Sequence, residues 1–307
     1  MTGNETQLPY QPKSCLFCEK GTGAKPLYPQ TFRDGDLSPQ VFSARRVTEH
    51  FHYNLVRCRG CRLVYSNPIL PDNVLEPLYA DSAVTFSEYS SVLKRDYWRP
   101  LAPHWNQQGG TALEIGCSSG FFLEELKAHG FDEVYGAEPS REAKQKADPS
   151  VRDGIHSGFF QGTETFPDKK FDLVCSFHTL DHITDPLKFI KNVKQVLAPN
   201  GMVYFVTHDV DALQAKLLGE KSPIFDIEHI YLFNKDHLAA LLERHGFDVV
   251  DVGNLKNSYP LNYWSKMAPL PKPLKSAVQG VFNATGLGEA APALPMGNIF
   301  VIGRSRQ

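Results

Sequence analysis

The sequence lacks several features that would place it in special classes of protein. No apolar run approaches the length of about 18 residues that a membrane-spanning helix needs. The first 13 residues are polar and lack the apolar core of a secretory signal, so we expect a cytoplasmic protein without a membrane partner. There is also no internal repeat and no low-complexity tract.

An excess of charge of one sign is lacking as well. The chain carries 32 Lys and Arg against 34 Asp and Glu, for a net charge of −2. Such a balance gives no general attraction to nucleic acid, although residues 1–66 are mildly basic. With 307 residues, 42% of them hydrophobic, the chain can fold into one large domain and one small one.

Cysteine is scarce, and four of the six cysteines form two C-x-x-C pairs. Cys15 and Cys18 form the first pair, and Cys58 and Cys61 form the second. Two such pairs can supply the four thiolates of a closed tetrahedral site, which favours a structural zinc ion. Disulfides and a redox pair are the alternatives, but cytosolic disulfides are rare and a redox motif needs only one pair.

The segment between the two cysteine pairs is longer than in short zinc-binding loops. It holds 39 residues, so we expect an insertion with strands of its own. His50 and His52 lie within it and are alternative metal ligands, but we interpret them as surface or site residues.

A strand, a glycine loop and a helix lie near the middle of the chain. Ala112 to Ile115 is a short apolar run typical of a buried strand, and the loop Gly116–Gly120 follows it. Glycine at both ends of this loop lets the backbone approach a ligand closely. A second short strand from Glu133 ends on Glu138, an acid placed to accept hydrogen bonds from ribose hydroxyls. An ordinary α/β crossover with a glycine turn is the alternative interpretation.

The spacing of this loop differs from the dinucleotide-binding G-x-G-x-x-G pattern. It reads Glu-x-Gly-x-x-x-Gly and resembles the first motif of the class I S-adenosylmethionine (SAM) methyltransferases, with Ser118 in place of the usual middle glycine. The resemblance implies that Glu114 and the loop backbone lie near the methionine part of SAM and that Glu138 holds the ribose. It implies these cofactor-binding residues: Glu114, Gly116, Cys117, Ser118, Gly120, Glu138, Pro139, Ser176 and Phe177.

A second segment carries the same resemblance. The run Phe171–Phe177 is a clear buried strand, and residues 178–186 after it resemble the family's fourth motif, with Asp181 replacing the usual Glu. We expect a helix after Asp185 and a fifth strand at Met202–Thr207. The resemblance implies an α/β, Rossmann-like sheet of seven strands, in which the last strand is antiparallel and lies beside the sixth.

These observations predict three parts of the chain. Residues 1–70 form a small zinc-ribbon-like module, and residues 71–110 form a helical linker. The resemblance implies that this linker covers the SAM pocket, and a helix that only packs against the sheet is the alternative. Residues 111–307 form the SAM-binding methyltransferase domain, with substrate-side insertions at 209–233 and 254–295. We expect the second insertion to be irregular apart from an amphipathic stretch. In the linker, an apolar face from Ser87 to Trp105 predicts a helix interrupted at Pro100.

The predicted function is SAM-dependent methyl transfer to a small-molecule acceptor. The resemblance favours O- or N-methylation of a sugar or natural-product intermediate. Glu228 and His229 resemble a pair in sugar C-methyltransferases in which a histidine is the base, although a structural or substrate-contact role for His229 is the alternative. If the acceptor is a hydroxyl, the candidate bases are His229, His178 and His182, in that order.

Two other functions are compatible with the sequence. One is a zinc-ribbon methyltransferase acting on ribosomal RNA, and the other is a non-catalytic SAM sensor or scaffold. The acidic remainder of the chain and the lack of an RNA-binding motif argue against a nucleic-acid partner.

Overall fold

The structure is a computed structural model that describes residues 8–18, 22–43, 50–83, 90–267 and 271–306. Its centre is a seven-stranded sheet with the order β10-β11-β8-β7-β4-β5-β6. The strands are β4 (Thr111–Ile115), β5 (Glu133–Glu138), β6 (Ile155–Ser157), β7 (Phe171–Phe177), β8 (Leu197–His208), β10 (Phe247–Asn257) and β11 (Leu294–Ser305).

The direction of the strands matches the predicted sheet. The pairs β4–β5, β4–β7, β5–β6 and β7–β8 are parallel. The last strand, β11, is antiparallel to both of its neighbours, β8 and β10. The expected Rossmann-like methyltransferase sheet is therefore confirmed.

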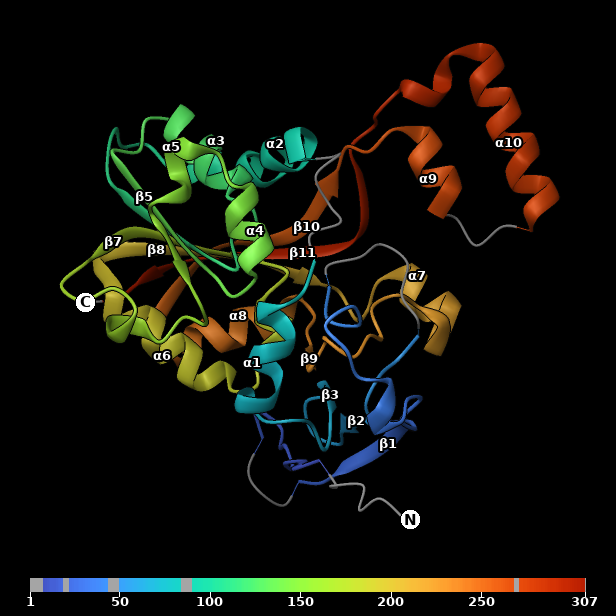
Figure 1. Cartoon of the computed structure of the whole chain (residues 1–307), viewed down its shortest axis with the longest axis horizontal. Helices are drawn as coiled ribbons and strands as arrows, with labels where there is room; N and C mark the ends of the chain where they lie inside the picture. Colours follow the sequence, from blue (N-terminus) through green and yellow to red (C-terminus); the bar gives the residue numbers. More distant parts are fainter. Residues whose placement is uncertain (1–7, 19–21, 44–49, 84–89, 268–270, 307) are drawn as a thin grey trace.

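Helices cover both faces of this sheet (Figure 1). On one face, α2 (Ser90–Leu101) and α3 (Phe121–Ala128) pack against side chains such as Leu173 and Cys175 of β7. On the other face, α6 (Pro186–Val196) and α8 (Lys235–Arg244) share a core with Val174 of the same strand. Successive β7 residues point to opposite faces, and both faces are apolar, which explains the continuous hydrophobic run of this strand.

The remaining helices are short or peripheral. They are α1 (Asp72–Ala80), α4 (Arg141–Lys146), α5 (Pro149–Arg152), α7 (Leu213–Leu218), α9 (Leu261–Met267) and α10 (Lys272–Thr285). Among the described helices, none is long and apolar enough to cross a membrane.

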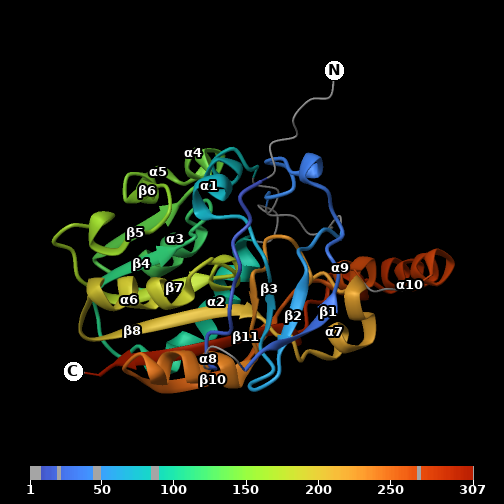
Figure 2. The same ribbon diagram turned by 90° about the horizontal axis from the view of Figure 1, so that it is seen from below.

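A second, four-stranded sheet joins the N-terminal residues to a distant part of the chain. Its order is β1 (Ala24–Tyr28), β2 (Leu55–Cys58), β3 (Val64–Ser66) and β9 (Tyr231–Leu232). Figure 2 shows the first three strands side by side next to the central sheet. Because β9 belongs to the insertion at 209–233, the predicted boundary at residue 70 separates strands that share one sheet.

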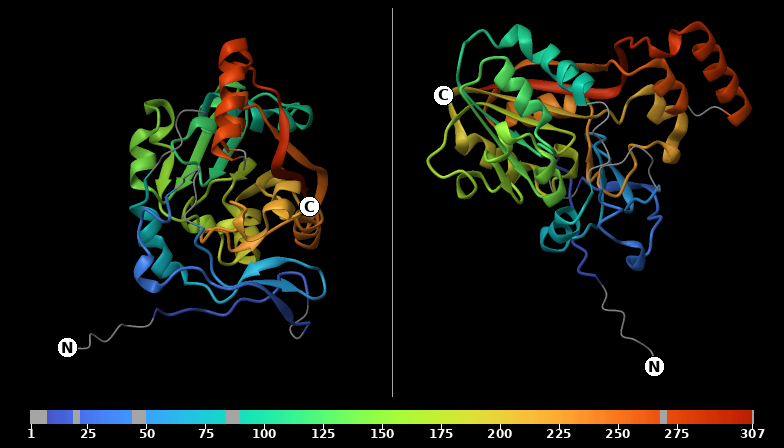
Figure 3. Two further views of the ribbon diagram at one scale, coloured as in Figure 1. Left: turned by 90° about the vertical axis from the view of Figure 1, so that its right-hand side faces the viewer. Right: turned by 45° about the horizontal axis from the view of Figure 1, so that its top comes forward.

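The segment 254–295 differs from its expected irregular form. Strand β10 continues to Asn257, and helices α9 and α10 follow. Helix α10 contains the predicted amphipathic stretch; Pro271 is its N-cap and Pro273 lies in its first turn, where a missing N–H group costs little. Helix α10 has no buried residue and projects from the rest of the molecule (Figure 3).

One predicted boundary also differs, and another is not tested. Strand β8 begins at Leu197 rather than Met202, because Pro199–Gly201 form an irregularity within the strand pairing. The predicted start of the linker helix at Ser87 lies outside the described residues, and its described part contains Pro100 in the last turn.

The shared small sheet makes a stability prediction. Leu232 is fully buried in a cluster with Leu55, Val64 and Phe225. We expect Leu232→Ala to lower the free energy of unfolding by about 2–5 kcal/mol, because it removes buried methyl groups and leaves a cavity. Urea unfolding measures this, with Leu213→Ala as the control, since Leu213 is 72% exposed. Equal unfolding midpoints for the two variants would contradict the packing described.

Candidate functional site

A large cavity of about 1100 Å³ opens beyond the carboxyl ends of the central strands. Its walls come from the loop after β4, the end of β5, the loop after β7, the insertion at 209–233 and helix α9. In open α/β sheets, ligands bind in this crevice. The volume is slightly above the range of about 300–1,000 Å³ for small-molecule sites, so it has room for more than one ligand.

The glycine loop forms one wall of the cavity. Gly116 has φ +77°, and a Cβ there would collide with the Thr179 side chain. Ser118 also has positive φ, 48°, so this position keeps the left-handed backbone although it lacks glycine. The amide N–H of Ser118 donates to Oε2 of Glu138 at 2.8 Å, which closes the loop onto the end of β5.

Glu138 is held in a fixed orientation by two backbone groups. Its Oε1 accepts from the N–H of Ser140 and its Oε2 from the N–H of Ser118, both at 2.8 Å. Burial raises the pKa of this carboxyl, and the two N–H groups partly offset the rise. Each carboxylate oxygen can accept two hydrogen bonds, so each keeps one position for a pair of donors such as ribose hydroxyls.

Glu114 has an unsatisfied carboxyl oxygen at the bottom of the cavity. Its side chain is 2% exposed, and Oε2 has no partner in the described part of the chain. Burial, and then the nearby charge of Glu138, raise the pKa of Glu114 well above its usual range. A buried polar atom of this kind points to a ligand that donates to it or carries positive charge.

The other predicted cofactor residues divide into two groups. Pro139 and Phe177 line the cavity. Cys117, Gly120 and Ser176 are not among its lining residues: Cys117 and Ser176 are buried side chains, and Gly120 is the N-cap of α3. Their role in cofactor binding stays a prediction.

Opposite the glycine loop, the three predicted histidines come together with a fourth one. His178 follows β7, and His182 ends a short 3-10 helix, η5 (Leu180–His182). His229 precedes β9, and His208 ends β8. Ring centroids lie 4.6 Å apart for His178 and His208, 4.6 Å for His208 and His229, and 5.1 Å for His182 and His229.

Asp181 lies at the centre of these histidines and is fully buried. Its Oδ2 accepts from Nδ1 of His208 at 2.8 Å and lies 3.9 Å from Nε2 of His229. Its Oδ1 lies 3.9 Å from Nε2 of His182. Burial alone would raise the pKa of Asp181, but the His208 hydrogen bond and the positive charge that the histidines can carry hold it well below its usual range.

The hydrogen bonds of His229 decide which of its nitrogens carries a proton. Nδ1 lies 2.7 Å from the carbonyl oxygen of Ile224. A carbonyl oxygen only accepts, so Nδ1 carries the hydrogen, and Nε2 of the neutral ring is an acceptor. Burial, followed by the charge of His208, lowers the pKa of His229, which favours this neutral form.

The other two predicted histidines are also biased toward the neutral form. Burial lowers the pKa of His178 and of His182 to about 3. His178 has positive φ, 49°, and its buried Nδ1 has no partner in the described part of the chain. His182 lies 3.5 Å from the hydroxyl of Tyr79 and 3.8 Å from a carboxylate oxygen of Glu228.

His208 is the functional candidate that reasoning from the sequence missed. It directly follows the predicted strand Met202–Thr207, and carboxyl ends of parallel strands meet at one edge of a sheet. Its position at the end of a predicted strand could have identified His208 as a candidate site residue. No sequence pattern, however, indicated that the side chain would bond to Asp181.

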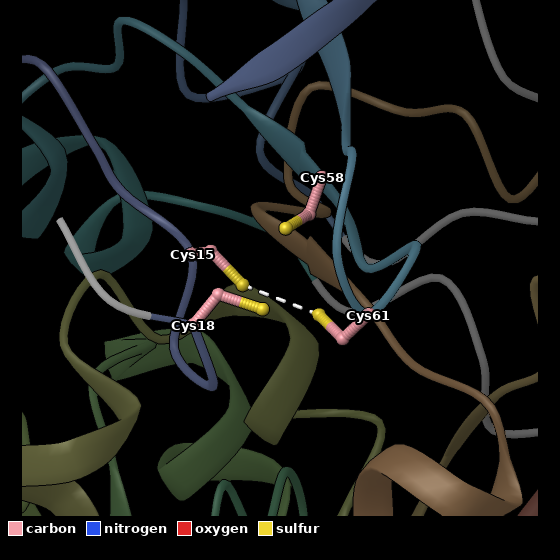
Figure 4. A group of neighbouring side chains, drawn as sticks. All are labelled: Cys15, Cys18, Cys58 and Cys61. Atoms are coloured by element: carbon pink, nitrogen blue, oxygen red, sulfur yellow. Dashed lines mark hydrogen bonds between the residues drawn. The ribbon is translucent and has the colours of Figure 1, made fainter. Parts of the chain in front are cut away.

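The four N-terminal cysteines form a second cluster (Figure 4), and none of them is among the residues that line the cavity. Their sulfur atoms lie within 4.8 Å of one another, and Sγ of Cys15 and Sγ of Cys61 are 3.3 Å apart. Although burial raises the pKa of Cys58, the amides of Cys61 and Gly60 lower it further, to about 7. Four sulfurs at this spacing fit one tetrahedral metal ion.

The two alternative histidine ligands lie outside this cysteine cluster. His52 is buried, and its Nδ1 lies 2.8 Å from the carbonyl of Tyr53. His50 is exposed. The cluster therefore consists of the two predicted pairs of cysteines.

The cysteine cluster is connected to the histidines through the backbone. Strand β3 follows Cys61 closely, and Ser66 at its end donates through Oγ to the carbonyl of His229 at 3.1 Å. The N–H of Ser66 donates to the carbonyl of Ile230 at 2.8 Å, and the N–H of Ile230 donates to the carbonyl of Asp181 at 2.7 Å. His229 is thus held between the cysteine module and the loop that carries Asp181.

Comparison with curated proteins finds partial relatives. A tRNA U34 carboxymethyltransferase of Idiomarina loihiensis is 28% identical over 166 residues, which cover 50% of this chain and 51% of the relative. A ubiquinone biosynthesis O-methyltransferase of Pasteurella multocida is 30% identical over 113 residues, covering 32% and 46%. The chain spans about half the length of the curated relatives it matches.

The relatives named for tRNA bear on the expected partners. The expectation that nucleic acid is an unlikely partner rested on overall charge and on the lack of an RNA-binding motif. It is contradicted by several matches to tRNA U34 carboxymethyltransferases. Overall charge was a poor guide because it reports on the whole surface and not on the cavity.

Among solved structures, a SAM-dependent methyltransferase from Archaeoglobus fulgidus is similar, with a TM-score of 0.48 and 15% identity. The match covers 76% of this chain and 99% of that one. The family described as "Methyltransferase domain" matches residues 87–252, more than half of the chain. This match supports an enzyme with SAM as its cofactor, and the chain belongs to the methyltransferase domain family.

Proposed function

We propose that this enzyme transfers a methyl group from SAM to a hydroxyl or amino group of a small polar acceptor, such as a sugar or a natural-product intermediate. One observation carries the proposal: the loop held by Glu138 and the histidines around Asp181 line the same cavity. A cofactor on the loop would therefore face an acceptor that lies against the histidines.

The residues of the loop fit the parts of SAM. Glu138 has free acceptor positions for the ribose hydroxyls, and Gly116 allows close approach of the ligand. The unsatisfied Glu114 fits the cationic methionine part. When bound, SAM supplies the methyl group that the acceptor oxygen or nitrogen takes up.

The acceptor must lose a proton as it is methylated, and His229 is placed to receive it. Its Nε2 is an acceptor because Nδ1 is bonded to Ile224, and the ring is held rigidly by that bond. A positioned general base contributes typically about 10²–10⁴-fold to the rate. Orienting the acceptor in the cavity contributes as well.

The lining of the cavity supports a polar acceptor. The side-chain N–H groups of Asn257 and Trp264 are buried in the cavity wall without a partner in the described residues. Asp209 and Lys235 also line it. A ligand with several hydroxyls could satisfy such groups, and a flat face of it could lie against Tyr259.

A second candidate acceptor is a nucleoside of tRNA. The relatives named tRNA U34 carboxymethyltransferases favour it. In this case one base would leave its stack and enter the cavity, as enzymes that modify bases require. Both candidates would use the same SAM site. They differ in the acceptor, which is either a whole small molecule in the cavity or one base of a tRNA whose remainder stays outside it.

We also propose that the four cysteines bind a structural zinc ion. All four ligand positions would be filled by sulfur, so the ion would have no open position for catalysis. Its contribution to function would be the support of β3, which holds the backbone of His229.

The proposed acceptor classes are tested by measuring S-adenosylhomocysteine formation. Unmodified tRNA and a panel of sugars and hydroxylated natural products are supplied in turn with SAM. We expect turnover with a small acceptor and a salt-independent rate. Turnover with tRNA alone, at a rate that falls steeply with salt, would replace the small acceptor by the second candidate. No SAM binding by the folded protein would contradict both.

The ribose contact predicts a specific loss of affinity. We expect Glu138→Gln to weaken SAM binding by about 100-fold, which corresponds to about 3 kcal/mol for hydrogen bonds to a charged group. Calorimetry measures it. Glu133→Gln is the matched control, because Glu133 is an exposed residue at the other end of the same strand. Equal affinities for the two variants would show that Glu138 does not hold the ribose.

The raised pKa of Glu114 predicts that SAM binding releases a proton. Without a ligand the neutral acid is favoured up to the raised pKa, and a cationic ligand favours the carboxylate. SAM affinity should therefore rise with pH as long as the pH stays below the raised pKa of the free enzyme. Calorimetry in buffers of different ionisation enthalpy detects the proton, and Glu114→Gln should release less. Equal proton release by the variant would contradict this role.

Support of His229 by the cysteine module predicts the effect of metal loss. We expect Cys58→Ser to lose bound zinc and to lower kcat much more than SAM affinity, because β3 holds His229 while the glycine loop lies in the central sheet. Metal analysis, calorimetry and kinetics measure the three quantities. Cys175→Ser, a buried cysteine outside the cluster, is the control for thiol loss. Unchanged kcat after loss of zinc would contradict the coupling.

A further inference from the structure

We propose that Asp181, His178 and His208 bind one divalent transition-metal ion in the wall of the cavity. This site is separate from the cysteine cluster. Binding of the ion does not depend on the function proposed above, whereas its role in catalysis does.

The three residues supply a set of donor atoms that fits a metal ion. One ligand atom from each of the three residues lies within 4.8 Å of the others. Asp181, His182 and His229 form a second trio with the same property, so Asp181 is common to both. Two imidazoles and one carboxylate bind ions such as Fe²⁺, Mn²⁺ and Zn²⁺ and leave coordination positions open for substrate.

Two polar atoms of these residues are left unsatisfied by the described part of the chain. Oδ1 of Asp181 and Nδ1 of His178 are both buried and have no hydrogen-bond partner within the described residues. Asp181 is fully buried. Buried polar atoms without a partner are rare in folded proteins, and a bound ion is one of the ordinary explanations. Here both residues belong to one candidate ligand set.

The negative charge of Asp181 also favours a cation at this place. In the described part of the chain, the ion pairs of Asp181 are with His182, His208 and His229 and with no Lys or Arg. A buried carboxylate without a fixed positive partner is costly, and buried charges are usually paired or bound to metals. A divalent cation would supply the missing positive charge while the imidazoles bind it in their neutral form.

The ligand residues are held in place by backbone hydrogen bonds, and two of their ligand atoms lie close together. The N–H of His178 donates to the carbonyl of Val206 at 2.8 Å, and the carbonyl of Asp181 accepts from Ile230 at 2.7 Å. Nδ1 of His208 and Oδ2 of Asp181 are 2.8 Å apart. Two ligands bound at about 2.1 Å and at right angles would be ~3.0 Å apart, so little movement is required. The ion would displace the proton that this pair shares.

If the function proposed above holds, the ion has a direct use. It would bind the acceptor hydroxyl oxygen, lower the pKa of that hydroxyl and orient it. Asp181 would then anchor the ion, and His229 would stay available to receive the proton. The alternative, a metal-free hydrogen-bond network of the same residues, is the other outcome of the test.

The test is a binding titration of the purified full-length protein with Mn²⁺, followed by electron paramagnetic resonance. Mn²⁺ prefers oxygen and nitrogen ligands, so zinc in the cysteine cluster does not compete for this measurement. We expect wild type to bind one Mn²⁺ per chain, and Asp181→Asn and His178→Ala to bind at least about tenfold more weakly. His156→Ala, which removes an exposed histidine, should bind as wild type does.

Substitution with Co²⁺ after removal of all metal distinguishes the two sites. Co²⁺ in the cysteine cluster has a thiolate charge-transfer band, which should remain in Asp181→Asn and disappear in Cys58→Ser. SAM affinity and thermal midpoint confirm that Asp181→Asn is folded. Wild type that binds no Mn²⁺, or Asp181→Asn that binds it equally well, would overturn the site. Metal binding without any methyl transfer would leave the site intact and count against the proposed function.

Discussion

The buried carboxylate of Asp181 is the constraint on which the candidate site depends. A charge in the interior must be compensated, and here the compensating groups come from the loop after β7, the end of β8 and the segment before β9. These segments are distant in the sequence, so the need to satisfy one carboxylate brings four histidines into one wall of the cavity. The histidines line the same cavity as the loop that Glu138 holds in place, whether a metal ion or protons balance the charge of Asp181.

The cysteine module is best understood as part of this arrangement. Strand β3 pairs with β9, so the module's sheet is completed by residues that belong to the substrate-side insertion. Ser66 holds the carbonyl of His229, and Ile230 connects the same segment to Asp181. A module that looks like an independent unit in the sequence is therefore physically continuous with the site. A change in this module would therefore act on the side of the cavity that holds His229, while the glycine loop is built on the central sheet.

Much of the fold was predictable from local patterns. The apolar run Phe171–Phe177, the glycine loop and the acid at Glu138 have strong local signals, and the sheet they imply is the one observed. The pairing of β3 with β9 was not predictable, because two residues make a strand only when a distant partner is present. Helix α10 contains the amphipathic stretch that was predicted, whereas the short helix α9 lies in a part of the segment that we expected to be irregular.

The site was predictable in part, for the same reasons. The two C-x-x-C pairs predict the cysteine cluster directly, and His178 and His182 lie in one short motif. His208 was missed because its importance comes from a partner that is 27 residues away in the sequence. Overall charge also misled the interpretation of partners, since the curated relatives include enzymes named for tRNA.

The central claim is that the loop held by Glu138 and the histidines around Asp181 form one active site. The structure of the protein in complex with S-adenosylhomocysteine tests it most directly. The account predicts ribose hydroxyls within hydrogen-bond distance of Glu138 and a sulfur atom that faces the side of the cavity lined by His178, His208 and His229. A ligand bound elsewhere, or one whose sulfur points away from these histidines, would contradict it.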